Sequence, residues 1–105
     1  MARNTMDIFR DRTRPPAHPG AILRHDVLPA LGMKPAQFAR HIGVSRQLLN
    51  KIIRENDPAP LSPEMAIRIG QACGNGPILW LNMQRNYDLW HAAKKVDIKS
   101  IEVAA

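Results

Sequence analysis

Five polar and basic residues lie close together in one short segment, and their side chains have the chemistry that recognises DNA. An arginine can donate two parallel hydrogen bonds to guanine, and a glutamine or asparagine can pair in the same way with adenine, each pair contributing about 1–3 kcal/mol of base discrimination. A lysine suits phosphate oxygens, which position a protein without discriminating sequence. The predicted DNA-reading set is Ser45, Arg46, Gln47, Asn50 and Lys51.

Two further basic residues, Lys34 and Arg54, flank this set and are expected to contact phosphates. The segment 33–54 holds five basic residues and no acidic one, in a chain of 105 residues with a formal net charge of +6. This concentration favours a polyanionic partner, with a solvated basic face as the open alternative. Arg54 is the weakest member of the set because Glu55 and Asp57 lower the positive field around it.

The residues around this set predict two short helices joined by a tight turn. The first runs from Pro35 to Ile42, and Gly43 can adopt the positive φ that ends it. Ser45 can cap the second helix by accepting from its N–H groups. Ala39, four residues before Gly43, allows the helices to cross closely, which is typical of a helix-turn-helix. The expected buried face of the second helix is Leu48, Leu49, Ile52 and Ile53.

Apolar periodicity predicts three more helices, and therefore an all-α domain of five. One spans Ala17 to Leu31, and Pro29 is expected to end it. Another follows the Ser62-Pro63-Glu64 start and runs to about Cys73, and the last runs from Pro77 to about Lys95. The predicted organisation is a basic N-terminal arm (1–16), a helix-turn-helix domain (17–95) and a C-terminal extension (96–105). The arm is expected to be flexible, with contact to a phosphate backbone as the alternative. For the extension, a short strand paired with a partner and a frayed tail both stay open.

Aromatic and sulfur-containing side chains recur along the last predicted helix at helical spacing. Trp and Tyr are favoured anchors of buried interfaces, so this stripe is a candidate dimer interface. The same stripe suits the core of a single chain, and the residues alone do not decide between the two. The candidate dimer residues are Trp80, Met83, Tyr87 and Trp90.

Other classes of protein find little support in the residues. The single cysteine, Cys73, excludes an internal disulfide framework, and no apolar run approaches the roughly 18 residues of a membrane span. No secretory signal is recognisable, so a cytoplasmic protein without a membrane partner is expected. No His or Cys spacing fits a metal site, no Gly-rich phosphate loop is present, and we expect neither cofactor nor enzyme activity. The histidines in question are His18, His25, His41 and His91.

Separate blocks of the sequence, in order, resemble the HigA/VapI antitoxins, a branch of the XRE-type (lambda-repressor-like) DNA-binding domains. The blocks are His18-Pro19-Gly20, Ile22-Leu23, Gly43-Val44-Ser45-Arg46-Gln47, Ser62-Pro63-Glu64-Met65-Ala66, Trp80-Leu81-Asn82-Met83-Gln84 and Tyr87-Asp88-Leu89-Trp90. The resemblance covers roughly 18–90. It implies a homodimeric antitoxin of a type II toxin–antitoxin pair, which binds a palindromic operator in double-stranded DNA, represses its own operon and neutralises a HigB toxin, a RelE-like ribonuclease.

Two positions depart from that family pattern. Lys34-Pro35 stands where many members open the second helix with Gln, so a charge contact to phosphate would replace an amide contact. The loop Glu55-Asn56-Asp57-Pro58 is acidic where members often have a basic loop. The alternatives to an antitoxin are an XRE-type repressor without a cognate toxin and, less favoured, an interaction module that no longer binds DNA.

Overall fold

The computed structural model describes residues 14–105, and the predicted features of 1–13, most of the N-terminal arm, lie outside the described residues. The described part contains five helices and no strand, which confirms the all-α prediction. The first helix is continuous and has three parts, α2 (Pro19–Ile22), the π-helical turn η1 (Leu23–Val27) and α3 (Leu28–Leu31). The others are α4 (Pro35–Ile42), α5 (Arg46–Ile53), α6 (Pro63–Cys73) and α7 (Pro77–Lys95), and a 3₁₀ turn, η2 (Ile98–Ser100), follows.

Pro29 does not end the first helix, so that prediction was wrong. The helix continues to Leu31 and ends at Gly32, which has φ 64°. A proline ring in a regular α-helix collides with the carbonyl group four residues earlier. Here the N–H of Leu28 instead donates to the carbonyl oxygen of Leu23, five residues back. We attribute the accommodation of Pro29 to this wider π turn, which relieves the crowding ahead of the ring.

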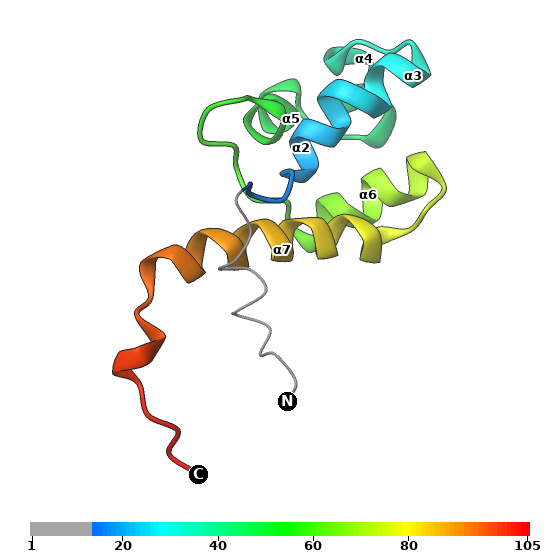
Figure 1. The fold of residues 1–105 in the computed structure, drawn as a ribbon. Coiled ribbons are helices and arrows are strands. Elements are labelled where there is room, and N and C mark those ends of the chain that lie inside the picture. Colours follow the sequence, from blue (N-terminus) through cyan, green and yellow to red (C-terminus); the bar gives the residue numbers. More distant parts are fainter. Residues whose placement is uncertain (1–13) are drawn as a thin grey trace.

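The core lies where the first helix, α4, α5 and α6 meet the start of α7, which runs beneath the other helices in Figure 1. Every one of these helices contributes at least one side chain that is almost completely buried. Burying such a side chain stabilises the fold by about 1.5–3 kcal/mol. The largest of these are Leu23, Phe38, Leu49, Ile52, Ile69 and Trp80.

A close backbone approach fixes α5 against the first helix. A Cβ atom at Gly20 would lie 1.9 Å from the carbonyl oxygen of Ile52, so only glycine fits at this crossing. One turn later, the guanidinium of Arg24 donates to the carbonyl oxygen of Ile53. Ile53 is the last residue of α5, so this bond supplies one of the carbonyl partners that a helix end lacks. The two contacts hold the C-terminal end of α5 in place.

The C-terminal extension forms no strand within its own chain. After α7 it makes the 3₁₀ turn η2, in which a side-chain oxygen of Asp97 accepts from the N–H of Lys99 at 3.1 Å. The hydroxyl of Ser100 donates to the carbonyl oxygen of Asp97 at 2.7 Å. Figure 1 shows the segment leaving the end of α7 and pointing away from the domain. Among the described residues, none of the helices has the length and apolarity of a membrane span.

Candidate nucleic-acid interface

The turn before α5 has the local structure that its residues predict. Gly43 adopts φ 78°, and the N–H of Val44 donates to the carbonyl oxygen of Ala39 at 2.9 Å, which closes the end of α4. Ser45 has an extended backbone, and its Oγ accepts from the N–H of Leu48 at 3.1 Å. The predictions that Gly43 ends α4 and that Ser45 caps α5 are therefore confirmed, and the N-terminal end of α5 is exposed to solvent.

The polar face of α5 is open along its whole length. The opposite face is buried in the core through Leu49, Ile52 and Ile53. On this face of α5, none of the four exposed polar side chains has a hydrogen bond or ion pair to the described residues 14–105. Their donors are therefore free to bind an external partner, and the core holds α5 in a fixed position. These side chains are Arg46, Gln47, Asn50 and Lys51.

Leu48 departs from the predicted buried face, because 39 % of it is exposed. It lies between the polar face and the core, on the flank of α5. An apolar side chain in that position is suited to contact the methyl group of a thymine or the sugar edge of a groove. Helical periodicity predicted that Leu48 is buried, because it assigned four aliphatic residues of α5 to one face. Three of them, Leu49, Ile52 and Ile53, are buried in the core.

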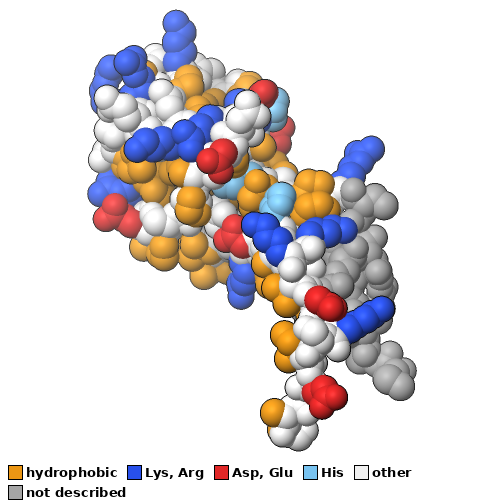
Figure 2. All heavy atoms as spheres, turned by 90° about the vertical axis from the view of Figure 1, so that its left-hand side faces the viewer, with side chains coloured by type: hydrophobic (Ala, Val, Ile, Leu, Met, Phe, Trp, Pro, Cys, Tyr) orange, Lys and Arg blue, Asp and Glu red, His pale blue; other side chains and the backbone are white. Residues whose placement is uncertain are grey.

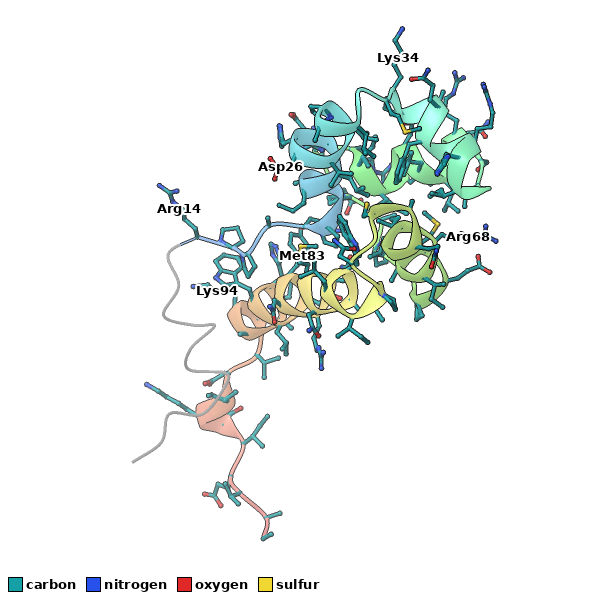
Figure 3. All side chains as sticks on the ribbon, turned by 90° about the vertical axis from the view of Figure 1, so that its right-hand side faces the viewer. Arg14, Asp26, Lys34, Arg68, Met83 and Lys94 are labelled. Atoms are coloured by element: carbon teal, nitrogen blue, oxygen red, sulfur yellow. The ribbon has the colours of Figure 1, made fainter. Side chains whose placement is uncertain are left out.

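Lys34 lies at the N-terminal end of α4 and projects away from the domain in Figure 3. Its backbone N–H donates to the Oε1 of Gln37 at 2.8 Å. Gln37 was not predicted as a capping residue, although a Gln three residues after the N-cap is a known start signal for a helix. The Lys34 ammonium group stays exposed, at the positive end of the α4 dipole, where an anion is favoured.

Arg54 is turned toward the acidic loop rather than toward the other basic side chains. Its Nε donates to the carbonyl oxygen of Asp57 at 2.8 Å, and its Nη2 lies 4.0 Å from the Asp57 carboxylate. Asp57 itself adopts a positive φ of 49°. A phosphate contact from Arg54 would have to compete with these two interactions, so the weak place of Arg54 in the predicted set has a structural cause.

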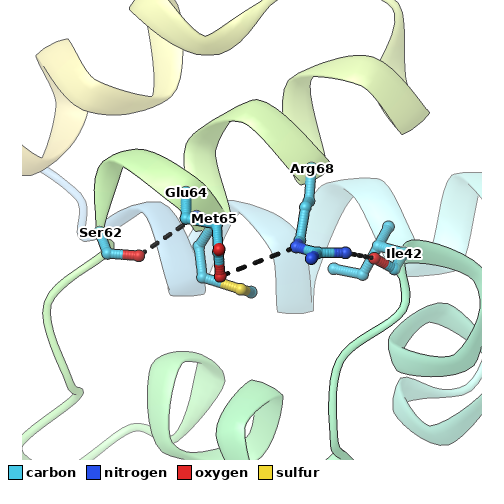
Figure 4. Close-up of polar contacts among 5 residues, drawn as sticks. All are labelled: Ile42, Ser62, Glu64, Met65 and Arg68. Atoms are coloured by element: carbon cyan, nitrogen blue, oxygen red, sulfur yellow. Dashed lines mark hydrogen bonds and ion pairs between the residues drawn. The ribbon is translucent and has the colours of Figure 1, made fainter.

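Arg68 is a supporting residue that the sequence did not predict, and it holds the end of α4 next to the turn before α5. Its Nη1 donates to the carbonyl oxygen of Ile42 at 2.7 Å, and its Nε lies 3.9 Å from the Glu64 carboxylate (Figure 4). This contact ties α6 to the last residue of α4, immediately before Gly43. No local pattern reveals a hydrogen bond between residues 26 positions apart. Ser62, which caps α6 through the N–H of Met65 at 3.2 Å, was predicted correctly.

The distribution of charge on the surface agrees with this geometry. In Figure 2, Lys and Arg side chains lie over the upper part of the face and also beside the end of α7 and the C-terminal segment, with a few acidic side chains among them. Hydrophobic side chains occupy more of the lower part, toward α7. Basic side chains are thus present on the part of the surface that carries α5, and they also extend along the end of α7.

Trp80 belongs to the core of its own chain, which corrects its assignment to a dimer interface. Only 1 % of it is exposed, and its indole N–H donates to the side-chain oxygen of Asn75 at 2.9 Å. A side chain with so little exposed surface cannot contact a second copy of the chain. The amide of Asn75 satisfies the one polar atom of the buried ring, which explains why a tryptophan fits this position.

The other three candidate dimer residues are half-buried, and two of them pack on aromatic neighbours of the same chain. The ring of Tyr87 meets that of His18 edge-on at 4.9 Å, and Trp90 meets His91 at 5.0 Å. Met83 lies against the core. Their part in a dimer stays a prediction.

His18 is the one buried histidine among the described residues, with 5 % of it exposed. Its Nδ1 accepts from the N–H of Gly20 at 2.9 Å, so the ring caps the first helix in its neutral form. Burial disfavours the imidazolium and lowers the pKa of His18 below its ordinary value of 6.5, outweighing the nearby Asp88 carboxylate. Burial also raises the pKa of the Cys73 thiol, which favours its protonated form over the thiolate.

Comparisons with known proteins place this interface in a family. Residues 27–81 match the model of the family described as Helix-turn-helix. Virulence-associated protein I of Dichelobacter nodosus is 35 % identical over 89 residues, which are 85 % of this chain and 79 % of that protein. Antitoxin HigA-1 of Vibrio cholerae is 32 % identical over 82 residues, covering 78 % of this chain and 75 % of that protein.

Solved structures similar to this chain include members of the same family. The Pseudomonas aeruginosa antitoxin HigA, determined with the higBA promoter, is 36 % identical and superposes with a TM-score of 0.73, covering 86 % of this chain and 95 % of that one. The structure of P. aeruginosa PA4674 in complex with its operator DNA is 34 % identical, with a TM-score of 0.78 over 88 % of this chain and 99 % of that one. By fold, motif and relatives, the chain belongs to the HigA/VapI-type antitoxins within the XRE-type helix-turn-helix family.

Proposed function

We propose that this chain is the DNA-binding antitoxin of a type II toxin–antitoxin module, which acts in the cytoplasm without catalysing a reaction. It binds a palindromic operator in its own promoter and represses its operon. The observation that carries the proposal is the open face of α5, where Arg46, Gln47, Asn50 and Lys51 are exposed on a helix that the core holds rigid.

The DNA contacts follow from the chemistry of that face. With α5 in the major groove, Arg46 donates to a guanine, and Gln47 or Asn50 pairs with an adenine. Lys51 and Lys34 donate to phosphates on either side, and the N-terminal ends of α4 and α5 favour the same anions. One copy spans only a few base pairs. A twofold dimer reads two half-sites about 34 Å apart, or a multiple of that distance.

The protein partner in this proposal is a HigB-like toxin, a RelE-like ribonuclease. Family membership supports it, since a solved relative is named antitoxin HigA and was determined with the higBA promoter. The alternative, an XRE-type repressor without a cognate toxin, is favoured by relatives named only as HTH-type transcriptional regulators, among them YddM of Escherichia coli, 31 % identical over 83 residues.

Co-expression with the product of the neighbouring reading frame separates these two functions. The antitoxin proposal expects that the neighbouring product arrests growth alone, that growth resumes when this chain is co-expressed, and that the two proteins co-purify. Arg46→Ala is the matched control, because it removes a DNA contact and should leave co-purification and growth rescue unchanged. A neighbouring product that is harmless and does not bind the chain would favour the repressor without a toxin.

A further inference from the structure

Leu48 is the one aliphatic side chain of α5 that is open to solvent beside the polar face of the helix. The other three, Leu49, Ile52 and Ile53, are 0 %, 1 % and 7 % exposed, whereas 39 % of Leu48 is exposed. Single leucines at the surface are common, so the exposure alone gives Leu48 no role. Its position on the helix is more informative.

Helical geometry places Leu48 at one edge of the exposed face of α5. Successive residues of an α-helix are rotated by about 100° around the axis, at 3.6 residues per turn. Leu48 therefore lies about 60° from Lys51 and about 200° from Arg46. Arg46 occupies one edge of the face, Gln47 its centre and Leu48 the other edge. With α5 in a groove, Arg46 and Leu48 therefore face different bases.

Leu48 also lies in the first turn of α5, at the end that recognition helices present to base edges. Its backbone N–H donates to the Oγ of Ser45 at 3.1 Å, so the helix cap fixes the position of this residue. The Cα–Cβ bonds of an α-helix tilt toward the N-terminus, and the side chain of Leu48 therefore leans toward Ser45. The leucine is held near the N-terminal tip of the helix.

The major groove offers a leucine one kind of apolar partner. The base edges carry hydrogen-bond donors and acceptors, which a leucine cannot satisfy, and the C5-methyl group of thymine, which it can contact. Cytosine that is methylated at C5 presents the same group. Contact between leucine and this methyl group removes apolar surface of both from water. A leucine against the amino group of cytosine or adenine would instead separate a polar group from water.

We propose that Leu48 is a specificity-determining residue, which contacts the C5-methyl group of a pyrimidine in each half-site of the operator. The proposal deepens the proposed function and rests on it, because α5 must lie in the major groove. The pyrimidine lies beside the base that Gln47 contacts, since the two residues are neighbours on α5. It is not part of the guanine contact of Arg46. Thymine supplies the methyl group in unmodified DNA.

Two other roles of Leu48 make different predictions. If the side chain only completed the core, shortening it would lower the stability of the fold and would weaken binding to every DNA alike. If it contacted the sugar edge of the groove, shortening it would weaken binding, but the methyl group of the base would have no effect. Only a contact with the base makes the affinity depend on Leu48 and on the methyl group together.

Replacement of thymine by uracil in the gene's own promoter tests the contact without changing the protein. Uracil keeps every hydrogen-bond donor and acceptor of thymine and lacks only the C5-methyl group. Each thymine is replaced in turn, and fluorescence anisotropy at one salt concentration gives the affinity of the full natural chain. At least one uracil in each half-site should weaken binding about three- to five-fold, the effect expected of one buried methyl group.

Leu48→Ala tests whether Leu48 makes this contact. The variant should bind the unmodified promoter at least about three-fold more weakly, and the critical uracil should cause no further loss. Leu48→Met keeps an apolar side chain of similar volume and should keep the dependence on the methyl group. Leu31→Ala, the matched control, shortens a leucine that is 50 % exposed at the end of α3 and should bind like the natural chain. The uracil scan needs no variant, so it tests the proposal even where Leu48→Ala fails to fold.

Cytosine and 5-methylcytosine at the critical position isolate the methyl group from the rest of the base. Both pair with guanine, and they differ only at C5. The natural chain should bind the promoter with 5-methylcytosine about three- to five-fold more tightly than the promoter with cytosine, and Leu48→Ala should bind the two equally. If no uracil weakened binding but methylation of the promoter's cytosines tightened it, thymine would be overturned as the source of the methyl group.

Two results would overturn the contact itself. One is that neither uracil nor 5-methylcytosine changes the affinity of the natural chain. The other is a uracil effect of equal size in Leu48→Ala, which would assign the methyl contact to another residue. The preference for the promoter over random DNA separates these failures from that of the proposed function. A chain that keeps this preference without any dependence on methyl groups refutes the role of Leu48 alone, whereas a chain without the preference refutes base reading by α5.

Discussion

At the scale of single residues, the exposed side chains of α5 and α4 divide by what they can donate. Arg46 has the planar, five-donor guanidinium that pairs with a guanine edge, whereas Lys51 and Lys34 carry compact charges that suit phosphate. All three are exposed, and Arg54, with an equal charge, is held by Asp57. Charge alone therefore does not define the interface. The geometry of each donor and the neighbours that compete for it decide its role.

Arg46→Ala should weaken binding to the operator by about 1–3 kcal/mol per half-site, because a bidentate pair with a base is lost. Binding to random DNA of equal length should change little. Fluorescence anisotropy with both DNA molecules at one salt concentration measures the difference. Gln71→Ala, on the exposed side of α6, is the control. An equal loss on both DNA molecules would show that Arg46 contacts phosphate rather than a base.

Lys51→Ala should reduce affinity for operator and random DNA alike. Each lost phosphate contact should also flatten the dependence of log K on log[salt] by about 0.9. Lys95→Ala removes the same charge from the far end of α7 and should leave the slope unchanged. Titrations at several salt concentrations give the slope. If both variants keep the wild-type slope, Lys51 does not contact a phosphate.

His18 should make stability depend on pH. The pKa of His18 in the folded chain lies below the unfolded value of 6.5. Below pH 6.5 the unfolded chain therefore binds a proton at this residue more readily than the folded chain does. Stability should therefore fall as the pH drops through 6.5 toward the folded pKa, by at most about 1.4 kcal/mol per pH unit.

His18→Asn keeps a side-chain acceptor at the helix start and does not titrate, which makes it the matched control. Urea unfolding at pH 7.5 and 5.5 gives the free energies of both proteins. The variant should lose less stability between the two pH values than the natural chain. Equal losses would mean that His18 is protonated as readily in the folded chain as in the unfolded one.

At the scale of elements, the angle of α5 depends on contacts that are far apart in sequence. Gly20 lets the first helix touch the backbone at Ile52, Arg24 binds the carbonyl of Ile53, and Arg68 holds the end of α4. Local signals predicted the Ser45 cap and the Gly43 stop, because capping involves residues within one turn. They could not predict the Arg68 contact or the π turn before Pro29, which depend on tertiary packing.

Gly20→Ala should destabilise the fold by about 1–3 kcal/mol or more, because its Cβ meets backbone atoms that cannot rotate away. In the fraction that still folds, α5 must shift, and operator affinity should fall although no DNA contact is removed. Gly32→Ala has no neighbour within 4 Å, so it suffers only the strain of a positive φ and should keep its affinity. If folded Gly20→Ala kept normal operator affinity, the close crossing of the first helix and α5 would not be needed for DNA binding.

At the scale of the whole molecule, α5 lies above α7, which runs beneath the other helices and is followed by the projecting C-terminal segment. The sequence predicted five helices and the exposed polar face of α5 because both follow from local periodicity. It assigned Trp80 to an interface because an aromatic stripe has the same spacing whether it meets the chain's own core or a second copy. Only the packing of the other helices against α7 resolves that ambiguity.

Direct competition between the gene's own promoter and random DNA tests the central claim, that α5 reads base edges. At physiological salt, the full chain should bind the promoter at least about 10³-fold more tightly than random DNA of the same length. The combined Arg46→Ala and Gln47→Ala variant, still folded, should lose most of that ratio. Equal affinity of the natural chain for both DNA molecules would contradict the account.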